Sequence, residues 1–291
     1  MNKDFGYGMG YELETYGIIL KKASALIPNS SLYTKESHEY LDYSKYNITN
    51  EIDLTDELLC GGEIISPIIY NEIELEKSIK LVLDVLEKTK AYDRVKRNSS
   101  ASLHFHFGLE VLEKNKEYFI RLIKFLKAFE GEIYEYSHAE GDELRRTIGI
   151  FARPYHRKVV EEIIKYFENS EPNYKGINEY LSLKKYMFRL GRKTIEFRTC
   201  NNPLVDNEII STDKLFDYEK SYEQFFAYFH MWQNILIYIK SSNYEKDLIE
   251  SYYENMRENP YQVIKERERV FKRIIKKWIK KYYFNHKKNR W

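Results

Sequence analysis

The stretch "SLHFHFG" (residues 102–108) alternates small or polar side chains with large apolar ones. Successive side chains of a β-strand point to opposite faces of the sheet, so His104 and His106 would share one face. The leucine and the two phenylalanines of the stretch would share the other face. The pattern therefore predicts a strand that packs an apolar back on a core and presents two imidazoles at the front.

Three other stretches combine an apolar back with ionisable groups at the front: "GYELET" with Glu12 and Glu14, "GGEIIS" with Glu63, and "TIEFRT" with Glu196 and Arg198. A solvent face usually carries Lys, Thr and Ser rather than Glu, His and Arg. Converging carboxylates repel one another unless cations lie among them. The oxygen-rich set, with one or two histidines, suits Mg²⁺ or Mn²⁺ better than structural zinc.

Each group also has a structural interpretation that the sequence leaves open. The two acids of the first stretch could lie on the solvent face of an edge strand, and the histidines could be hydrogen-bonded sheet residues. A buried Glu63 is costly without a partner, and a salt bridge to Arg198 or Arg189 would supply one. Glu196 and Arg198 could form an ion pair with neighbouring residues on a paired strand.

In this order, the four stretches resemble the amidoligase family, the carboxylate–amine ligases that share a fold with glutamine synthetase and glutamate–cysteine ligase. The resemblance extends over roughly residues 8–205. It implies an α+β fold in which an antiparallel sheet, backed by helices, curves into an open funnel. ATP and metal ions would bind on the inner face of that sheet.

The resemblance also implies roles for individual residues. His106 would contact the acceptor carboxylate or its phosphate, and Arg198 would face the transferred phosphoryl group. Arg189, on the strand expected to pair with the last stretch, could reach the phosphates or the substrate carboxylate. Three further candidates precede that strand: Arg145 and Arg146 of an arginine-bearing segment, and His138 in a loop that could close over the site. The metal ligands would be Glu12, Glu14, Glu63, His104 and Glu196.

The implied reaction is ATP-dependent formation of an amide or isopeptide bond through an acyl phosphate. The acid would be a glutamyl or aspartyl group or a peptide carboxylate, and an amine would be the second substrate. Residues 28–56 match the family poorly and are expected to select the substrate. Two alternatives remain: a metal-dependent hydrolase that uses the histidines and acids, and an inactive module that binds acidic partners or nucleic acid.

Hydrophobic periodicity predicts helices over residues 72–92, 110–128 and 156–167, and short strands and loops between 31 and 57. Residues 180–191 and 193–200 read as two antiparallel strands, and a further strand would end near Pro154. From residue 219 onward the pattern is helical. We therefore expect a catalytic domain at residues 1–218 and a helical extension at 219–291, the C-terminal third of the protein.

The C-terminal residues 265–291 form a basic amphipathic pattern, with twelve lysines and arginines against two glutamates. Apolar residues recur at helical spacing along it, which predicts one apolar stripe on a cationic helix. The helix could simply dock on the protein. It could also bind an acidic protein or peptide, a polyanion such as nucleic acid, or an anionic membrane surface.

The bulk composition names no partner, because 47 basic and 45 acidic residues leave a formal net charge of +2. No apolar run reaches the roughly 20 residues that a membrane span needs, and the first residues lack a signal-peptide core. A cytoplasmic location is expected. The two cysteines, Cys60 and Cys200, are too few for a disulfide framework and read as small, partly buried residues.

Overall fold

The computed structural model describes residues 4–16, 20–34, 42–50, 61–89, 102–137, 152, 154–169, 187–190, 193–201, 203–206, 216–255, 259–260 and 262–279. These residues form two compact units that alternate along the chain. The first unit takes in the described residues up to Phe107 and those from Cys200 to Phe225. The second takes in those from Gly108 to Thr199, and those from Phe226 onward.

A mostly antiparallel sheet forms the centre of the first unit. Its strands lie in the order β2-β3-β4-β1-β6, and β5 also pairs with β1. All of these pairs are antiparallel except β2 with β3, which is parallel. The strands are β1 (Asp4–Tyr16), β2 (Ser30–Thr34), β3 (Tyr46–Asn50), β4 (Gly61–Ile65), β5 (Ile69–Asn71) and β6 (Ser102–Gly108). Two helices, α1 (Leu20–Leu26) and α2 (Glu72–Thr89), complete this part, and β9 (Val205–Asp206) pairs with β10 (Phe216–Asp217).

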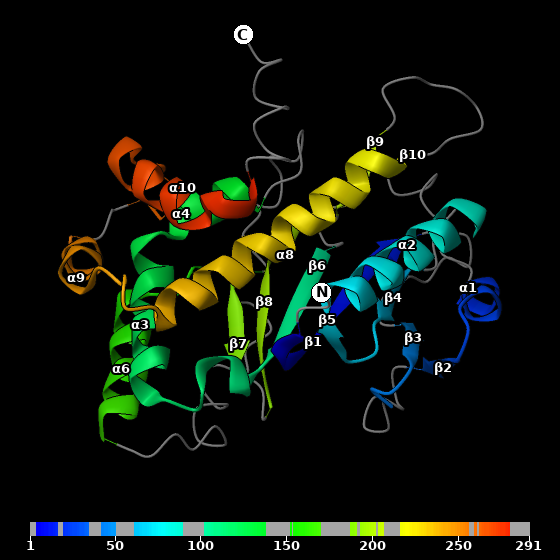
Figure 1. Cartoon of the computed structure of the whole chain (residues 1–291), viewed down its shortest axis with the longest axis horizontal. Helices are drawn as coiled ribbons and strands as arrows, with labels where there is room; N and C mark the ends of the chain where they lie inside the picture. Colours follow the sequence, from blue (N-terminus) through cyan, green and yellow to red (C-terminus); the bar gives the residue numbers. More distant parts are fainter. Residues whose placement is uncertain are drawn as a thin grey trace, which may run out of the picture. The chain divides into compact units, whose positions relative to one another are not determined.

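Helix α2 covers the apolar face of this sheet, as Figure 1 shows. On β1 that face presents Met9, Tyr11 and Leu13, which are all buried. The Tyr11 hydroxyl lies 2.7 Å from Ser78 Oγ on α2, and the Tyr46 hydroxyl donates to the same oxygen at 2.7 Å. Because side chains alternate along a strand, the other face of β1 is left to the polar residues.

Glycines in β1 allow β5 to pair closely with it. Gly6 has a φ of +73°, in the left-handed region, and the register of β1 with β5 shifts between Asp4 and Met9. This combination is typical of a β-bulge. A Cβ on Gly8 would lie 2.8 Å from Ile68 Cγ2, so only glycine fits at this position without movement of its neighbours.

The second unit is mainly helical around a hairpin of β7 (Phe188–Leu190) and β8 (Thr194–Asn201). Helix α3 packs against α6 and α9, and α10 packs against α4 (Figure 1). Stacked aromatic rings fill its core, with Phe197 and Trp232 at a centroid distance of 3.9 Å. The remaining elements are the 3-10 turn at Leu109–Leu112, α3 (Lys116–Ala128), α4 (Glu130–Tyr136), α6 (Arg157–Asn169), α9 (Lys246–Glu254) and α10 (Lys265–Ile279). Helix α8 (Tyr218–Lys240) begins in the first unit and continues into the second.

The predicted mixture of helices and mostly antiparallel strands is confirmed. One predicted helix, at residues 110–128, is divided: a 3-10 turn is followed by Glu113 and Lys114, both with positive φ. Helix α3 then begins at Lys116, where the side chain of Asn115 accepts a hydrogen bond from Glu117 N at 2.9 Å. An asparagine cap favours a new helix start at this point.

Other expectations about the fold stay predictions. They are the curvature of the sheet, its likeness to glutamine synthetase, the helical C-terminal third and the domain division at residue 218. Most of the strand expected to end near Pro154 lies outside the described residues, as does Cys60. Cys200 is buried and forms no disulfide bond with the residues that the structure describes. Among the helices that the structure describes, none is both long and apolar enough to cross a bilayer.

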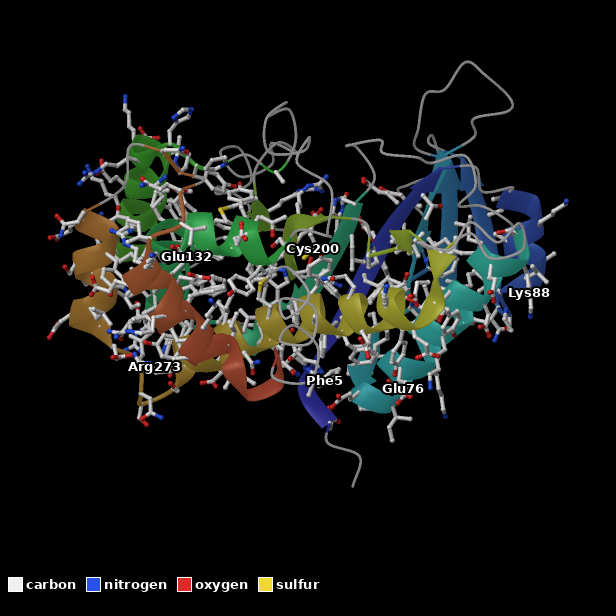
Figure 2. The ribbon with its side chains drawn as sticks, turned by 90° about the horizontal axis from the view of Figure 1, so that it is seen from above. Phe5, Glu76, Lys88, Glu132, Cys200 and Arg273 are labelled. Carbon is white, nitrogen blue, oxygen red and sulfur yellow. The ribbon has the colours of Figure 1, made fainter. Side chains whose placement is uncertain are left out.

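The described part of the basic C-terminal helix, α10, docks on the second unit through buried Val270, Phe271 and Ile275. Several of its cations have partners there. Lys272 Nζ lies 2.6 Å from Glu268 Oε1, and the exposed Arg273, labelled in Figure 2, pairs with Glu245. The amphipathic pattern is therefore confirmed for the side chains that the structure describes, as far as Ile275. Binding of an acidic partner or polyanion to this helix stays a prediction.

Candidate active site

Polar side chains form a buried row across the first unit's sheet. The strand register makes Glu14 the partner of Glu63, and Glu63 the partner of Thr49. Directly paired residues share a face, with Cβ atoms roughly 4.5–5.5 Å apart. Ser102 Oγ donates a hydrogen bond to Glu14 Oε2, which extends the row to β6. Glu63 and Thr49 are buried, and the Glu14 side chain is only 17% exposed. We call these four residues the carboxylate row.

A second row on the same face brings both histidines to one carboxylate. Glu12 is the register partner of His104, and Gly10 is the partner of His106. His104 Nδ1 lies 3.3 Å from Glu12 Oε2, and His106 Nε2 lies 3.1 Å from Glu12 Oε1. One imidazole therefore stands at each carboxylate oxygen. We call Glu12, His104 and His106 the histidine row.

The histidine row keeps Glu12 ionised. Burial alone would raise the pKa of Glu12, but the attraction of His106 and hydrogen bonds from both histidines lower it well below its ordinary value. A carboxylate must be deprotonated to coordinate a metal ion. The lowered pKa of Glu12 therefore favours the deprotonated form that coordination of a metal ion requires.

Ser102 connects the two rows and was not predicted as a site residue. Its Oγ lies 2.7 Å from His104 Nε2 and also donates to Glu14 Oε2. His104 Nε2 is itself 3.8 Å from Glu14 Oε1. Ser102 stands two residues before His104, so strand alternation alone places it on the same face.

Two further polar residues, Asn47 and Thr49, lie on this face and were also not predicted. Both side chains are buried, and Asn47 is the register partner of Ile65, next to Glu12. Asn47 Oδ1 and Thr49 Oγ1 have no hydrogen-bond partner among the residues that the structure describes. Both belong to residues 28–56, the stretch expected to select the substrate.

The donor set of the two rows fits a divalent cation. It consists of three carboxylates and two imidazoles on one sheet face. The described strands of the first unit contain no lysine or arginine, so these strands offer only histidines as cationic partners. Oxygen-rich sites with some imidazole suit Mg²⁺ or Mn²⁺. Glu12, Glu14, Glu63 and His104 could hold such an ion.

In the second unit, the carboxylate of Glu196 lies between two guanidinium groups. Arg189 is its register partner on β7, and Arg189 Nη1 lies 3.6 Å from Glu196 Oε2. Arg198 Nη1 contacts the other oxygen, Oε1, and both Arg198 and Glu196 are buried. The ion pair considered from the sequence is therefore present. Two guanidiniums flank one carboxylate, and guanidinium groups are common partners of anions such as phosphate.

The structure thus groups the predicted site residues within each unit. Glu12, Glu14, Glu63, His104 and His106 share one sheet face of the first unit, and Arg189, Glu196 and Arg198 come together in the second. Their catalytic and metal-binding roles stay predictions. Arg145, Arg146 and His138 lie outside the described residues.

A comparison with protein families finds one model that matches residues 6–217, a family described as "Putative amidoligase enzyme". The matched range includes both rows of the first unit and the β7–β8 hairpin. No curated protein matches the chain.

Proposed function

The chain belongs to the amidoligase family, and from this premise we propose that it is an ATP-dependent ligase that joins a carboxylate to an amine. The family description supports a ligase-type enzyme. The use of ATP, the acyl phosphate, Mg²⁺ or Mn²⁺ and a glutamine synthetase-like arrangement are parts of the proposal. The acid would be a glutamyl, aspartyl or peptide carboxylate.

The observation that carries the proposal is the pairing of like charges on one sheet face. Glu14 and Glu63 are direct register partners, with Glu12 two residues away from Glu14 on the same strand. Like charges that face each other across strands destabilise a sheet. An arrangement that costs stability at a buried position is typical of a functional site, and a bound divalent ion would offset the repulsion.

Each residue then has a distinct task. Glu12, Glu14, Glu63 and His104 would hold metal ions, with Glu196 as a further candidate. Such ions, when bound, neutralise charge on the ATP phosphates. In the second unit, Arg198 and Arg189 would bind the transferred phosphoryl group, because guanidinium groups offer paired donors in a fixed geometry. His106, on the histidine row, would contact the acceptor carboxylate or its phosphate.

The proposed reaction balances in two steps. A carboxylate oxygen of the acid attacks the γ-phosphorus of ATP, the bond from that phosphorus to the bridging oxygen breaks, and ADP leaves with the electron pair. The amine nitrogen then attacks the carbonyl carbon of the acyl phosphate. Inorganic phosphate leaves with the electron pair of the C–O bond, and the nitrogen loses a proton. Exclusion of water would protect the acyl phosphate from hydrolysis.

The proposed binding of ATP is tested by calorimetric titration of ATP into the purified protein, with and without Mg²⁺. The same titration is made with Glu14→Ala, Glu196→Ala and a control, Glu76→Ala. Glu76 lies on α2, on the side away from the strands (Figure 2), and its exposed pair with Lys80 contributes little to stability. We expect Mg²⁺-dependent binding in the wild type and the control, and its loss in the two site variants.

Circular dichroism of each variant shows whether it is folded. If the wild-type protein binds no ATP with Mg²⁺ or Mn²⁺, the proposed ligase activity is contradicted. If it binds ATP, release of ADP in the presence of paired carboxylates and amines identifies the substrates. Release of ADP that requires both an acid and an amine would distinguish a ligase from the hydrolase alternative.

A further inference from the structure

Two buried side chains of β3 carry oxygens whose hydrogen-bonding capacity is not met within the fold. Asn47 and Thr49 are both buried, and neither Asn47 Oδ1 nor Thr49 Oγ1 has a partner among the residues that the structure describes. A buried polar atom without a partner costs stability, because it gives up its hydrogen bonds to water. Such atoms are uncommon in native proteins, and a role in binding or catalysis is one explanation for them.

The hydrogen bonds of Asn47 fix the orientation of its side-chain amide. One end of the amide lies 3.0 Å from Asp42 O and 3.1 Å from Lys45 O. These are carbonyl oxygens, which only accept hydrogen bonds, so the atom that faces them must be Nδ2. Both of its hydrogens are then used, and Oδ1 remains as an acceptor. The partner that Oδ1 requires must therefore be a hydrogen-bond donor, which the hydroxyl of Thr49 can also accept.

The two oxygens lie beside the carboxylate row, on the side away from β1. Thr49 is the register partner of Glu63, and Asn47 is the partner of Ile65, which in turn pairs with Glu12. Two strand spacings, roughly 9.5 Å, separate β3 from β1. Because Mg²⁺ binds oxygen at about 2.1 Å, an ion held on β1 is too distant to contact both oxygens. A substrate that extends from the metal site could reach them.

The reacting groups of the proposed ligase differ in what they offer to such oxygens. The γ-phosphate and the carboxylate are acceptors, whereas an amino group donates and is mostly protonated near neutral pH. The described strands of this unit contain no lysine or arginine that could compete for Asn47 or Thr49. We propose that Asn47 Oδ1 and Thr49 Oγ1 bind the primary ammonium group of a substrate, an inference that rests on the proposed function. This group belongs either to an amino-acid carboxylate substrate or to the amine substrate.

Three small probes distinguish these two sources. L-Glutamate has an acid chain and an amino group, glutarate has the acid chain without the amino group, and n-butylammonium has only the amino group. Binding of each to the full chain with Mg²⁺ and ADP is measured by calorimetry. Tighter binding of L-glutamate than of glutarate, by about 10-fold or more, would assign the ammonium group to the acid. Binding of n-butylammonium would assign it to the amine substrate. Equal affinity for the two acids without binding of n-butylammonium would overturn the inference.

Two threonine variants separate ligand binding from stability. Thr15 Oγ1 is also buried without a partner in the described part of the chain, but Thr15 lies two residues from Leu13, on the apolar face. Thr49→Val and Thr15→Val each replace such a hydroxyl with a methyl group, so neither should lower the Tm. Only Thr49→Val should weaken binding of the ammonium-bearing probe, by about 10-fold. Unchanged binding in Thr49→Val would mean that the hydroxyl meets internal water alone, and would overturn the inference.

The contribution of Asn47 is followed by NMR, because a substitution would also remove its bonds to the two carbonyl groups. Its side-chain amide signals, in the full chain labelled with ¹⁵N-asparagine, are assigned by their absence in Asn47→Gln. We expect them to shift with the ammonium-bearing probe and not with glutarate. Signals that stay in place with every probe would exclude Asn47 from the binding site.

Binding of ATP distinguishes failure of this inference from failure of the proposed function. If the wild type binds no ATP with Mg²⁺ or Mn²⁺, the proposed function fails. If it binds ATP but does not favour the ammonium-bearing probes, only the inference about Asn47 and Thr49 fails. A larger loss of affinity for ATP than for the ammonium-bearing probe in Thr49→Val would assign the oxygens to the nucleotide or its metal ion, and would also overturn the inference.

Discussion

Glu14 on β1 and Glu63 on β4 are direct register partners on the polar face of the first unit. Two carboxylates in this relationship repel each other in the metal-free protein, and a bound cation reverses the sign of their contribution. The pair therefore connects the stability of the fold to occupancy of the proposed metal site.

Replacing Glu63 with glutamine should stabilise the metal-free protein. The change keeps the shape of the side chain and removes one of the two like charges, which is worth roughly 0.2–1 kcal/mol for a directly opposed pair. Thermal unfolding measured with EDTA should show a higher Tm than the wild type. Addition of Mg²⁺ should raise the Tm of the wild type more than that of Glu63→Gln. A Tm below the wild-type value in EDTA would show that repulsion from Glu14 is not the dominant influence on Glu63.

Replacing Glu196 with glutamine should separate two roles of this residue. The substitution frees Arg189 and Arg198 from a negative partner, so binding of inorganic phosphate without metal should strengthen. If Glu196 is also a metal ligand, Mg²⁺-dependent binding of ATP should be lost in the same variant. Calorimetry with each ligand measures both effects. Retention of full Mg²⁺-dependent ATP binding would limit Glu196 to holding the two arginines.

Arg267 should be necessary for the stability of the second unit, in contrast to its exposed neighbour Arg269. Arg267 is buried, donates to Ala128 O at 3.0 Å and to Asn255 O, and lies over the ring of Tyr252. Removing its side chain leaves those two carbonyl groups without these donors, which typically costs about 1–3 kcal/mol each. Urea unfolding should show a loss on the order of 2–4 kcal/mol for Arg267→Ala.

The control for this measurement is Arg269→Ala on the same helix. Arg269 is exposed, and exposed substitutions usually change stability by less than about 0.5 kcal/mol. A similar loss in both variants would mean that charge or helix propensity, rather than the buried contacts of Arg267, is responsible.

His230 should make the protein less stable in mild acid. Burial lowers the pKa of His230 to about 4, while a hydrogen bond with Gln233 raises it slightly. The unfolded chain binds a proton near the ordinary value of about 6.5, so it takes up more protons than the folded chain between these two values. The free energy of unfolding should therefore fall as the pH decreases from about 6.5 to about 4, by up to roughly 3 kcal/mol.

Urea unfolding at a series of pH values measures this effect. The comparison is with His230→Gln, whose side chain does not titrate, so the difference in stability between variant and wild type should change over this pH range. A difference that stays constant with pH would exclude His230 as the source.

Strand alternation was sufficient to predict which side chains share a face. It placed Glu12 with Glu14 and His104 with His106, and the structure confirms the strands and their buried apolar backs. Alternation alone cannot show which residue lies opposite which on another strand. That register depends on pairing between segments far apart in the sequence, so the facing of Glu14 and Glu63 became visible only in the structure.

The residues that sequence reasoning missed have polar side chains without an ionisable group. Polar residue types of this kind also occur on the solvent faces of ordinary strands, so the sequence alone gives no sign that Ser102, Asn47 and Thr49 belong to a site. For Ser102, the spacing of two residues to His104 was enough to predict that it lies on the same face as the carboxylates. For Asn47 and Thr49, the alignment of β3 with β4 had to be known first.

The central place of β1 has a consequence for how the ligands are held. Glu12 and Leu13 are partnered on both sides, by β4 and by β6, so neither edge of the strand is open at this position. Amide hydrogens in such a segment exchange with solvent only when a large cooperative part of the structure opens. The exchange rate of these two amides should therefore report the stability of the whole first unit, and the carboxylate of Glu12 is anchored to a backbone that opens only when that unit does.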